Sequence, residues 1–253
     1  MKAVIIAAGM GRRMGDVTEA LPKPLAIRWN GQSLFDYQVR TFQNCGISDI
    51  VVIRGFEGEK FTRDDVKYVW NRDYASNNIL LSLMHAREVI SGELIISYSD
   101  IWFEESVVKA LAASKDDISV VVDRKWKDAY VGRSDHPVEE AEVVKFDDLG
   151  NVSLIGKIAT GVQDADAEFI GMMKIRGQGI ESFLKSFDKA QSEFKGKPFQ
   201  RAKAFEKSYL TDLLQYMIGN GTQVSPCEIQ GSWMEMDTDQ DLKRFLDCMS
   251  SQI

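Results

Sequence analysis

The chain has 253 residues and a formal net charge of −7 at pH 7, and 44% of its residues are hydrophobic. This length allows one large domain with a substantial core, and the negative balance excludes the broad basic surface that a nucleic-acid or anionic-membrane binder needs. No apolar run reaches the roughly 18 residues of a membrane span, and three cysteines without CxxC spacing, with no signal pattern before them, predict a cytoplasmic protein with reduced thiols.

The first half of the chain, to about residue 123, alternates short apolar runs with segments of helical periodicity. Continuous apolar runs are typical of buried parallel strands, and the apolar stripes between them predict helices packed on the sheet. This order of strand, helix and strand predicts right-handed βαβ units. The predicted strands are residues 2–7, 49–53, 65–70, 93–98 and 118–122, and the predicted helices are residues 33–46, 78–90 and 107–113.

The second half, from about residue 124 to residue 253, has a mixed pattern. A polar turn at residues 147–151 separates two apolar segments and predicts a hairpin. The further predicted strands are residues 169–175, 223–229 and 233–237, and the helices are residues 180–194, 209–218 and 239–249. Without a linker or repeat, residues 1–253 are predicted to form one α/β domain. We expect a Rossmann-like fold with a mixed, mainly parallel central sheet flanked by helices, and a small hairpin-containing region.

The first predicted strand runs into a glycine-rich loop with the sequence AAGMGRRMG, residues 7–15. Glycines let backbone N–H groups approach phosphate oxygens, and arginines bind a triphosphate through paired hydrogen bonds. The spacing GxGxxxG differs by one residue from the dinucleotide fingerprint, and the Walker pattern is absent. Taken alone, the loop fits phosphate binding and an ordinary tight turn about equally well.

A single lysine, Lys23, is framed by Pro22 and Pro24. A residue that precedes proline favours extended backbone, so Leu21 and Lys23 are both expected to be extended. A stiff loop of this kind fixes the direction of the ammonium group, which suits the stabilisation of charge at a phosphorus centre.

Three features together resemble the nucleotidyltransferase superfamily, in its sugar-nucleotidyltransferase-like form: the AAGxGxRxG loop, the PKP that follows, and a strand ending at Asp100. Residues 71–78 and 233–238 are similar to segments of phosphocholine cytidylyltransferases, and residues 130–142 most resemble the 2-aminoethylphosphonate cytidylyltransferase type. The resemblance implies transfer of CMP from CTP to a small phosphonate or phosphate-monoester acceptor, with release of pyrophosphate. It makes the first half the nucleotide-binding half and the second half the acceptor-binding half.

The resemblance also implies roles for single residues. The catalytic residues would be Lys23, Arg12 and Arg13: Lys23 would contact the phosphates around the reacting centre, and the two arginines would bind the β- and γ-phosphates together with Gly9 and Gly11. Asp100 and Asp237 would hold Mg²⁺, which prefers carboxylate and phosphate oxygens, although a strand-end turn is another explanation for Asp237. The nucleotide-binding residues would be Ala7, Ala8, Gly9, Gly11, Asn77, Asn78 and Ser82. A helix cap explains either asparagine equally well.

An acceptor with an anionic phosphonate and a cationic amine needs both a cation and a carboxylate in its site, and an aromatic ring adds a cation–π contact. The predicted acceptor-binding residues are Arg133, His136, Glu142, Lys157 and Trp102. Half-buried packing is the competing interpretation for the tryptophan, and an exposed hairpin position is the competing interpretation for Lys157.

The charges are unevenly distributed along the chain. Residues 1–30 have five basic and two acidic side chains, whereas residues 228–247 have two basic and six acidic ones. We expect these two segments to face one site with a cation between them.

An acceptor oxygen that is already ionised near pH 7 needs no general base, in keeping with the presence of only two histidines. Two other functions stay open: a sugar-1-phosphate nucleotidyltransferase that uses UTP, GTP or dTTP, and a non-catalytic nucleotide-binding regulatory protein. The loop spacing disfavours a dinucleotide oxidoreductase. The expected partners are CTP and a small phosphonate or phospho-alcohol, with a homodimer left open. Cytosine rests on the resemblance alone.

Overall fold

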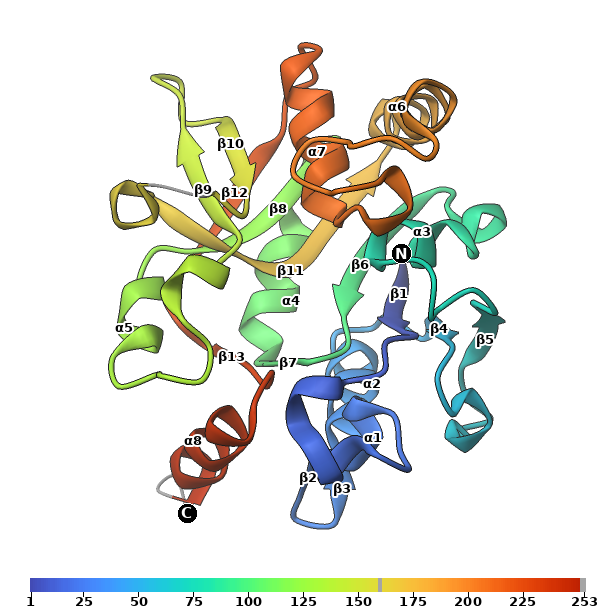
Figure 1. The fold of residues 1–253 in the computed structure, drawn as a ribbon, viewed down its shortest axis with the longest axis vertical. Coiled ribbons are helices and arrows are strands. Elements are labelled where there is room, and N and C mark those ends of the chain that lie inside the picture. The colour runs from blue at the N-terminus through green and yellow to red at the C-terminus, as the bar shows by residue number, and fades with distance from the viewer. Residues whose placement is uncertain (159–160, 251–253) are drawn as a thin grey trace.

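The structure, a computed structural model, describes residues 1–158 and 161–250, with the side chains of Arg12, Asp16 and Val17 outside this description. A nine-stranded sheet runs through the described residues in the order β10-β9-β11-β6-β1-β4-β5, with β8 beside β11 and β12 beside β8 (Figure 1). Its strands are β1 (Lys2–Ala7), β4 (Asp49–Arg54), β5 (Lys67–Trp70), β6 (Glu93–Tyr98), β8 (Ile118–Asp123), β9 (Val143–Phe146), β10 (Val152–Gly156), β11 (Ala167–Arg176) and β12 (Ser225–Ile229).

The sheet has a parallel core and an antiparallel side. β1 pairs parallel with β4 and β6, and β4 pairs parallel with β5. The long strand β11 pairs antiparallel with β6, β8 and β9, and β9 with β10 forms the predicted hairpin. The predicted α/β fold with a mixed central sheet is confirmed.

Helices cover both faces of the sheet, because successive side chains of a strand point to opposite faces. On β1, Val4 and Ile6 pack with α3, α6 and α7. Ala3, Ile5 and Ala7 point the other way and pack with α2 and α4. Within the described residues, no helix combines the length and the apolar character needed to cross a bilayer. The helices are α1 (Lys23–Ala26), α2 (Leu34–Asn44), α3 (Ile79–Met84), α4 (Glu105–Ala113), α5 (Trp126–Tyr130), α6 (Gln178–Phe194), α7 (Leu210–Gly219) and α8 (Asp239–Ser250).

A small antiparallel sheet of β7 (Ile101–Phe103) and β13 (Trp233–Glu235) fixes the C-terminal segment beside the end of β6. Helix α8 then packs Phe245 into a cluster with Met14 from the N-terminal segment. Figure 1 accordingly shows α8 below the main sheet, on the same side as the N-terminal segment. A second two-stranded pair, β2 (Arg28–Trp29) with β3 (Gln32–Ser33), precedes α2.

Two local predictions were wrong. The helix predicted over residues 78–90 ends at Met84, and Asn78 makes no side-chain cap because its amide donates to the Lys207 carbonyl oxygen at 3.0 Å. Lys23 begins the one-turn helix α1 and is not extended. Pro24 fits this first turn because an N–H group there has no partner within the helix.

Candidate active site

A cavity of about 330 Å³ lies at the carboxyl ends of the parallel strands β1 and β6. Ligands bind at this edge in open α/β sheets. The predicted residues that line the cavity are Ala8, Gly9, Gly11, Arg13, Lys23, Asn77, Asn78, Ser82, Asp100, His136, Glu142, Lys157 and Asp237. The structure therefore brings most of the predicted site residues to one place.

Lys23 lies between two carboxylates in this cavity. Its Nζ donates to Oδ2 of Asp100 at 2.9 Å and to Oδ1 of Asp237 at 2.5 Å. The Lys23 side chain is only 11% exposed and that of Asp237 only 3%. Burial alone would lower the pKa of Lys23, but the two carboxylates outweigh it and raise this pKa above its usual value. The ammonium group therefore stays charged between the two anions.

The pairing of β7 with β13 explains how the two aspartates meet. Glu235 lies opposite Ile101 in the register, and the Met236 N–H donates to the Asp100 carbonyl oxygen at 2.9 Å. Immediately after Asp237 the chain enters α8, whose start is held by a capping box of Thr238 and Asp241. The backbone is thus fixed on both sides of Asp237.

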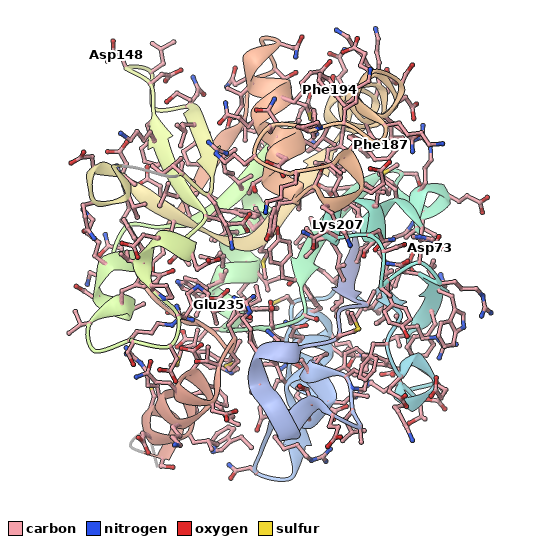
Figure 2. The ribbon with its side chains drawn as sticks, in the orientation of Figure 1. Asp73, Asp148, Phe187, Phe194, Lys207 and Glu235 are labelled. Carbon is pink, nitrogen blue, oxygen red and sulfur yellow. The ribbon has the colours of Figure 1, made fainter. Side chains whose placement is uncertain are left out.

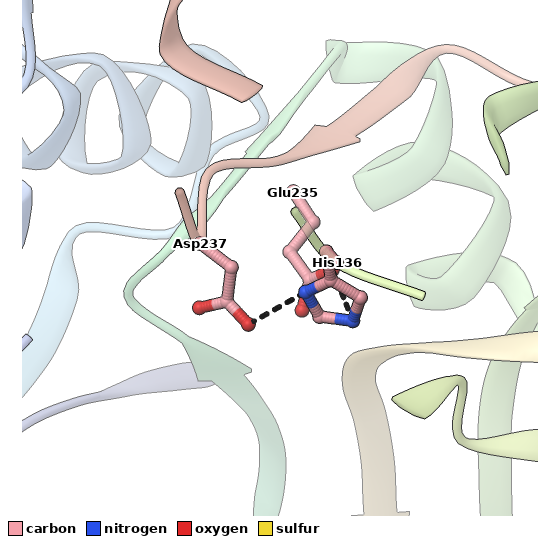
Figure 3. Close-up of side chains that lie close together, drawn as sticks. All are labelled: His136, Glu235 and Asp237. Carbon is pink, nitrogen blue, oxygen red and sulfur yellow. Dashed lines mark ion pairs between the residues drawn. The ribbon is translucent and has the colours of Figure 1, made fainter. Parts of the chain in front are cut away.

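Asp237 has two further nitrogen-bearing neighbours. Nη2 of Arg13 lies 2.9 Å from Oδ2, and Nδ1 of His136 lies 3.2 Å from the same oxygen. Nε2 of His136 faces Oε2 of Glu235 at 3.8 Å, so the imidazole faces both carboxylates (Figure 3). Burial alone would raise the pKa of Asp237, but Lys23 and these two side chains hold it well below its usual range. Asp237 is therefore ionised at neutral pH.

The loop after β1 presents bare backbone to the cavity. A side chain added at Gly9 would meet nothing within 4 Å. Gly11 has a φ of +60°, and a Cβ there would lie 3.0 Å from Cβ of Lys23. Glycine at this position therefore lets the loop pack directly against the lysine. Arg13 of the same loop reaches Asp237, whereas the side chain of Arg12 lies outside the described part of the chain.

One part of the cavity wall is built on a cluster of amides. Asn71 is fully buried, and its Nδ2 donates to Oδ1 of Asn77 at 3.0 Å and to Oγ of Ser82 at 2.8 Å. Asn77 returns a hydrogen bond to Oδ1 of Asn71 at 3.0 Å. Asn77 and Ser82 line the cavity, so Asn71 holds both of them in fixed orientations.

Another part of the cavity wall contains Glu142, Lys157 and Glu168. Oε1 of Glu142 accepts a hydrogen bond from Oγ1 of Thr211, and burial raises the pKa of Glu142 to about 7. Lys157 pairs with Glu140 at 2.5 Å and lies 5.1 Å from the ring centre of Tyr209. This part of the wall therefore combines one lysine, Lys157, with the carboxyl groups of Glu140, Glu142 and Glu168.

Glu168 has unmet bonding capacity. Its Oε1 accepts from the Tyr130 hydroxyl at 2.6 Å, while its Oε2 is buried and has no hydrogen-bond partner in the described part of the chain. Burial raises the pKa of Glu168 well above its usual value. Burying a carboxyl oxygen without a hydrogen bond costs free energy. A cationic ligand in the cavity could pair with this oxygen.

Three predicted residues do not line the cavity. Ala7 belongs to the core between the sheet and α2, because alternation along β1 turns it away from Ile6. Trp102 packs against Phe245 of α8 with ring centroids 6.1 Å apart, so its predicted contact with the acceptor is replaced by packing. Arg133 binds Asp241 and Glu235.

Several cavity residues were missed from the sequence. Glu235 lies near the middle of the molecule (Figure 2) and stands two positions before Asp237 in the predicted strand. Residues two apart in a strand share a face, so this spacing was a usable signal. Tyr98, Glu168 and Tyr209 had no comparable signal, because only the tertiary fold brings them to the cavity.

An open α/β sheet with a glycine-rich loop after its first strand, and a lysine between two aspartates at the strand ends, has the architecture of a nucleotidyltransferase. The family described as the MobA-like NTP transferase domain matches residues 3–216, and the chain belongs to this family. The superfamily resemblance that the sequence motifs predicted is confirmed.

Individual relatives agree with this assignment. The CTP:phosphoglutamine cytidylyltransferase of Campylobacter jejuni is 27% identical over 254 residues, covering 96% of this chain and 98% of that protein. The choline-phosphate cytidylyltransferase of Streptococcus pneumoniae is 35% identical over 108 residues, covering 41% of this chain and 47% of that protein. The solved CTP:phosphocholine cytidylyltransferase from Streptococcus pneumoniae superimposes with a TM-score of 0.71 at 21% identity, over 98% of both chains, which shows a common fold.

Proposed function

We propose that this nucleotidyltransferase transfers CMP from CTP to a small phosphonate or phosphate-monoester acceptor that also has a positively charged end, such as 2-aminoethylphosphonate or phosphocholine. The observation that carries the proposal is the buried Lys23 ammonium between Asp100 and Asp237, in the cavity that also contains the glycine loop. The choice of CTP is supported by the two cytidylyltransferases to which the chain is similar.

In the proposed reaction an anionic oxygen of the acceptor attacks the α-phosphorus of CTP. A new phosphorus–oxygen bond forms, and the bond to the bridging oxygen breaks, so that pyrophosphate leaves with the electron pair. No proton has to be removed from the acceptor. Lys23 supplies positive charge next to the reacting phosphorus, and Arg13 supplies it near the leaving phosphates.

The donor chemistry of the site fits Mg²⁺. Asp100 and Asp237 offer hard carboxylate oxygens that converge on one cation, the Lys23 ammonium. These two residues would hold the ion, and bound Mg²⁺ would supply charge neutralisation at the phosphates. Asp237 is kept ionised by its neighbours, which suits a metal ligand. Lys23 would then be free to turn from the aspartates toward the substrate phosphates.

The positive end of the acceptor is proposed from three carboxyl groups that line the cavity. These are Glu142, Glu168 and Glu235, and Oε2 of Glu168 has no hydrogen-bond partner among the described residues. Lys157 lies among them and would bind the acceptor phosphonate. A Glu168→Gln variant should raise the KM for phosphocholine and leave the KM for CTP unchanged, whereas equal effects on both would contradict this assignment.

The test of the whole proposal is a substrate panel read by pyrophosphate release. CTP, UTP, GTP and dTTP would each be combined with phosphocholine, 2-aminoethylphosphonate, phosphoglutamine and glucose 1-phosphate. We expect turnover with CTP and an amine-bearing acceptor. Turnover with glucose 1-phosphate and UTP, GTP or dTTP alone would overturn the proposal in favour of a sugar-1-phosphate enzyme. Nucleotide binding without release of pyrophosphate under every combination would indicate a regulatory protein.

A further inference from the structure

Arg133 makes a dense set of contacts outside the cavity. Its side chain is 6% exposed. Its Nε and Nη2 donate to Oδ1 and Oδ2 of Asp241 at 2.6 and 2.9 Å, a two-pronged pair, and Nη2 also donates to Oε2 of Glu235 at 2.9 Å. The guanidinium lies 5.1 Å from the ring centre of Tyr130. Arginine is suited to such a site because its planar fork matches a carboxylate.

Asp241 connects this arginine to the backbone of the active site. Its Oδ2 accepts hydrogen bonds from the N–H of Asp237 at 3.1 Å and from the N–H of Thr238 at 2.9 Å. The Asp241 side chain is 3% exposed. Arg133 therefore reaches the backbone of Asp237 through a single buried carboxylate, although the two residues lie far apart in the chain.

We infer that Arg133 is a positioning residue, which orients Asp237 by holding Asp241 against the turn between β13 and α8. The inference rests on the proposed function, in which Asp237 is a metal ligand. Outer-shell groups that hydrogen-bond to a metal ligand set its orientation, and their loss typically weakens metal binding about 10–100-fold. Asp241 is such a group, and Arg133 holds it in place. Arg133 also holds Glu235, so one guanidinium fixes an acidic residue on each side of Asp237 in the chain, Glu235 in β13 and Asp241 in α8.

Gln240 of α8 offers a matched control, because it bonds to the residues on either side of Arg133. Gln240 accepts from the N–H of Ser134 at 2.8 Å and donates to the Gly132 carbonyl oxygen at 3.2 Å. These bonds join residues 132–134 to α8, as the ion pair of Arg133 with Asp241 does. Neither bond of Gln240 involves Asp237 or Asp241. Loss of Gln240 should therefore loosen the attachment of α8 without disturbing the support of Asp237.

A purely structural role for Arg133 makes a different prediction. Removing one partner of a buried ion pair leaves the other charge uncompensated, which lowers stability whatever the site does. Stability alone therefore does not distinguish the two roles, but the affinity for a divalent cation does. A lysine at this position keeps the charge and loses the fork, so Arg133→Lys separates geometry from charge.

The experiment measures Mn²⁺ binding in the presence of CTP, by electron paramagnetic resonance of the free ion, well below the unfolding temperature of each variant. We expect Arg133→Gln to weaken Mn²⁺ binding about 10–100-fold, Arg133→Lys to weaken it less, and Gln240→Ala to leave it unchanged. Asp241→Asn should match Arg133→Gln, and combining the two should add little.

Steady-state kinetics give a second readout: kcat should fall in Arg133→Gln while the KM for CTP stays near the wild-type value. Wild-type Mn²⁺ affinity in folded Arg133→Lys and Asp241→Asn proteins would overturn the inference and leave the proposed function intact. A wild-type protein that binds no Mn²⁺ with CTP and releases no pyrophosphate would overturn the proposed function, and the inference with it.

Discussion

Lys23 and Asp237 are separated by 214 positions in the chain, and yet they form a buried ion pair at 2.5 Å. The pair joins the basic N-terminal segment to the acidic C-terminal segment, as their opposite local charges predicted. The overall charge of −7 therefore describes the surface, while the site is built where the two locally charged segments meet.

Replacement of Lys23 by alanine should lower kcat by a factor on the order of 10²–10³, because one preorganised positive charge is lost from the reacting centre. The protein should still fold, since Arg13 and His136 continue to face Asp237. The measurement is pyrophosphate release with saturating CTP, accompanied by a circular dichroism melt. Near-wild-type turnover in the folded variant would remove Lys23 from the mechanism.

Asp237→Ala should lower kcat to a similar extent, on the order of 10²–10³, and should raise the Mg²⁺ concentration needed for half-maximal rate. Asp237→Asn tests the charge with little change of shape. The matched control is Glu228→Gln, in the same acid-rich segment, because Glu228 lies on the surface in an ion pair with Arg124. Equal Mg²⁺ requirements in Asp237→Asn and the wild type would rule out this ligand.

Much of the fold could be predicted from the sequence, because its strands are long apolar runs and its helices have clear periodicity. β1 and β6 are buried almost throughout and begin and end where the apolar runs do. The elements that were missed are short: β7 has three residues and α1 has four. A run of this length shows no period, and its pairing partner lies far away in the chain.

The site could be predicted only in part, because local motifs mark some of its residues and only long-range pairing brings in the others. Lys23, Asp100 and the glycine loop lie within recognisable local motifs, so their positions at the strand ends followed from the chain. Glu168 reaches the cavity only because β11 pairs antiparallel with β6. Arg133 was predicted to bind the acceptor from its polar surroundings, but its buried carboxylate partner is more than 100 residues away in the chain.

Gly171→Ala should destabilise the protein by about 2–6 kcal/mol, the sum of backbone strain and overpacking. Gly171 has a φ of +83°, in an irregular part of β11, and a Cβ there would lie 2.4 Å from Cδ2 of Tyr98. The control is Gly150→Ala, at a φ of +81° with nothing within 4 Å, which has the strain without the clash. Urea unfolding measures the free energy of unfolding of both variants. Equal decreases in the two variants would show that Tyr98 moves aside without cost.

Glu142 should make stability depend on pH in a defined direction. Burial raises its pKa to about 7 from a usual value of 4.5, so between these values the folded protein holds a proton that the unfolded chain has released. Stability from this group is therefore lost as the pH rises through that window, with a slope of at most about 1.4 kcal/mol per pH unit. Glu142→Gln cannot release this proton.

The free energy of unfolding of Glu142→Gln minus that of the wild type should accordingly increase from about pH 4.5 to about pH 7 and stay level above that. The control is Glu140→Gln in the same cavity. The hydrogen bond from Lys157 lowers the pKa of Glu140. The stability that ionised Glu140 provides is therefore lost only as the pH falls below the usual pKa of a glutamate. The free energy of unfolding of Glu140→Gln minus that of the wild type should stay flat over the interval in which the Glu142 difference rises. A flat difference for Glu142→Gln as well would show that Glu142 ionises like a solvent-exposed glutamate.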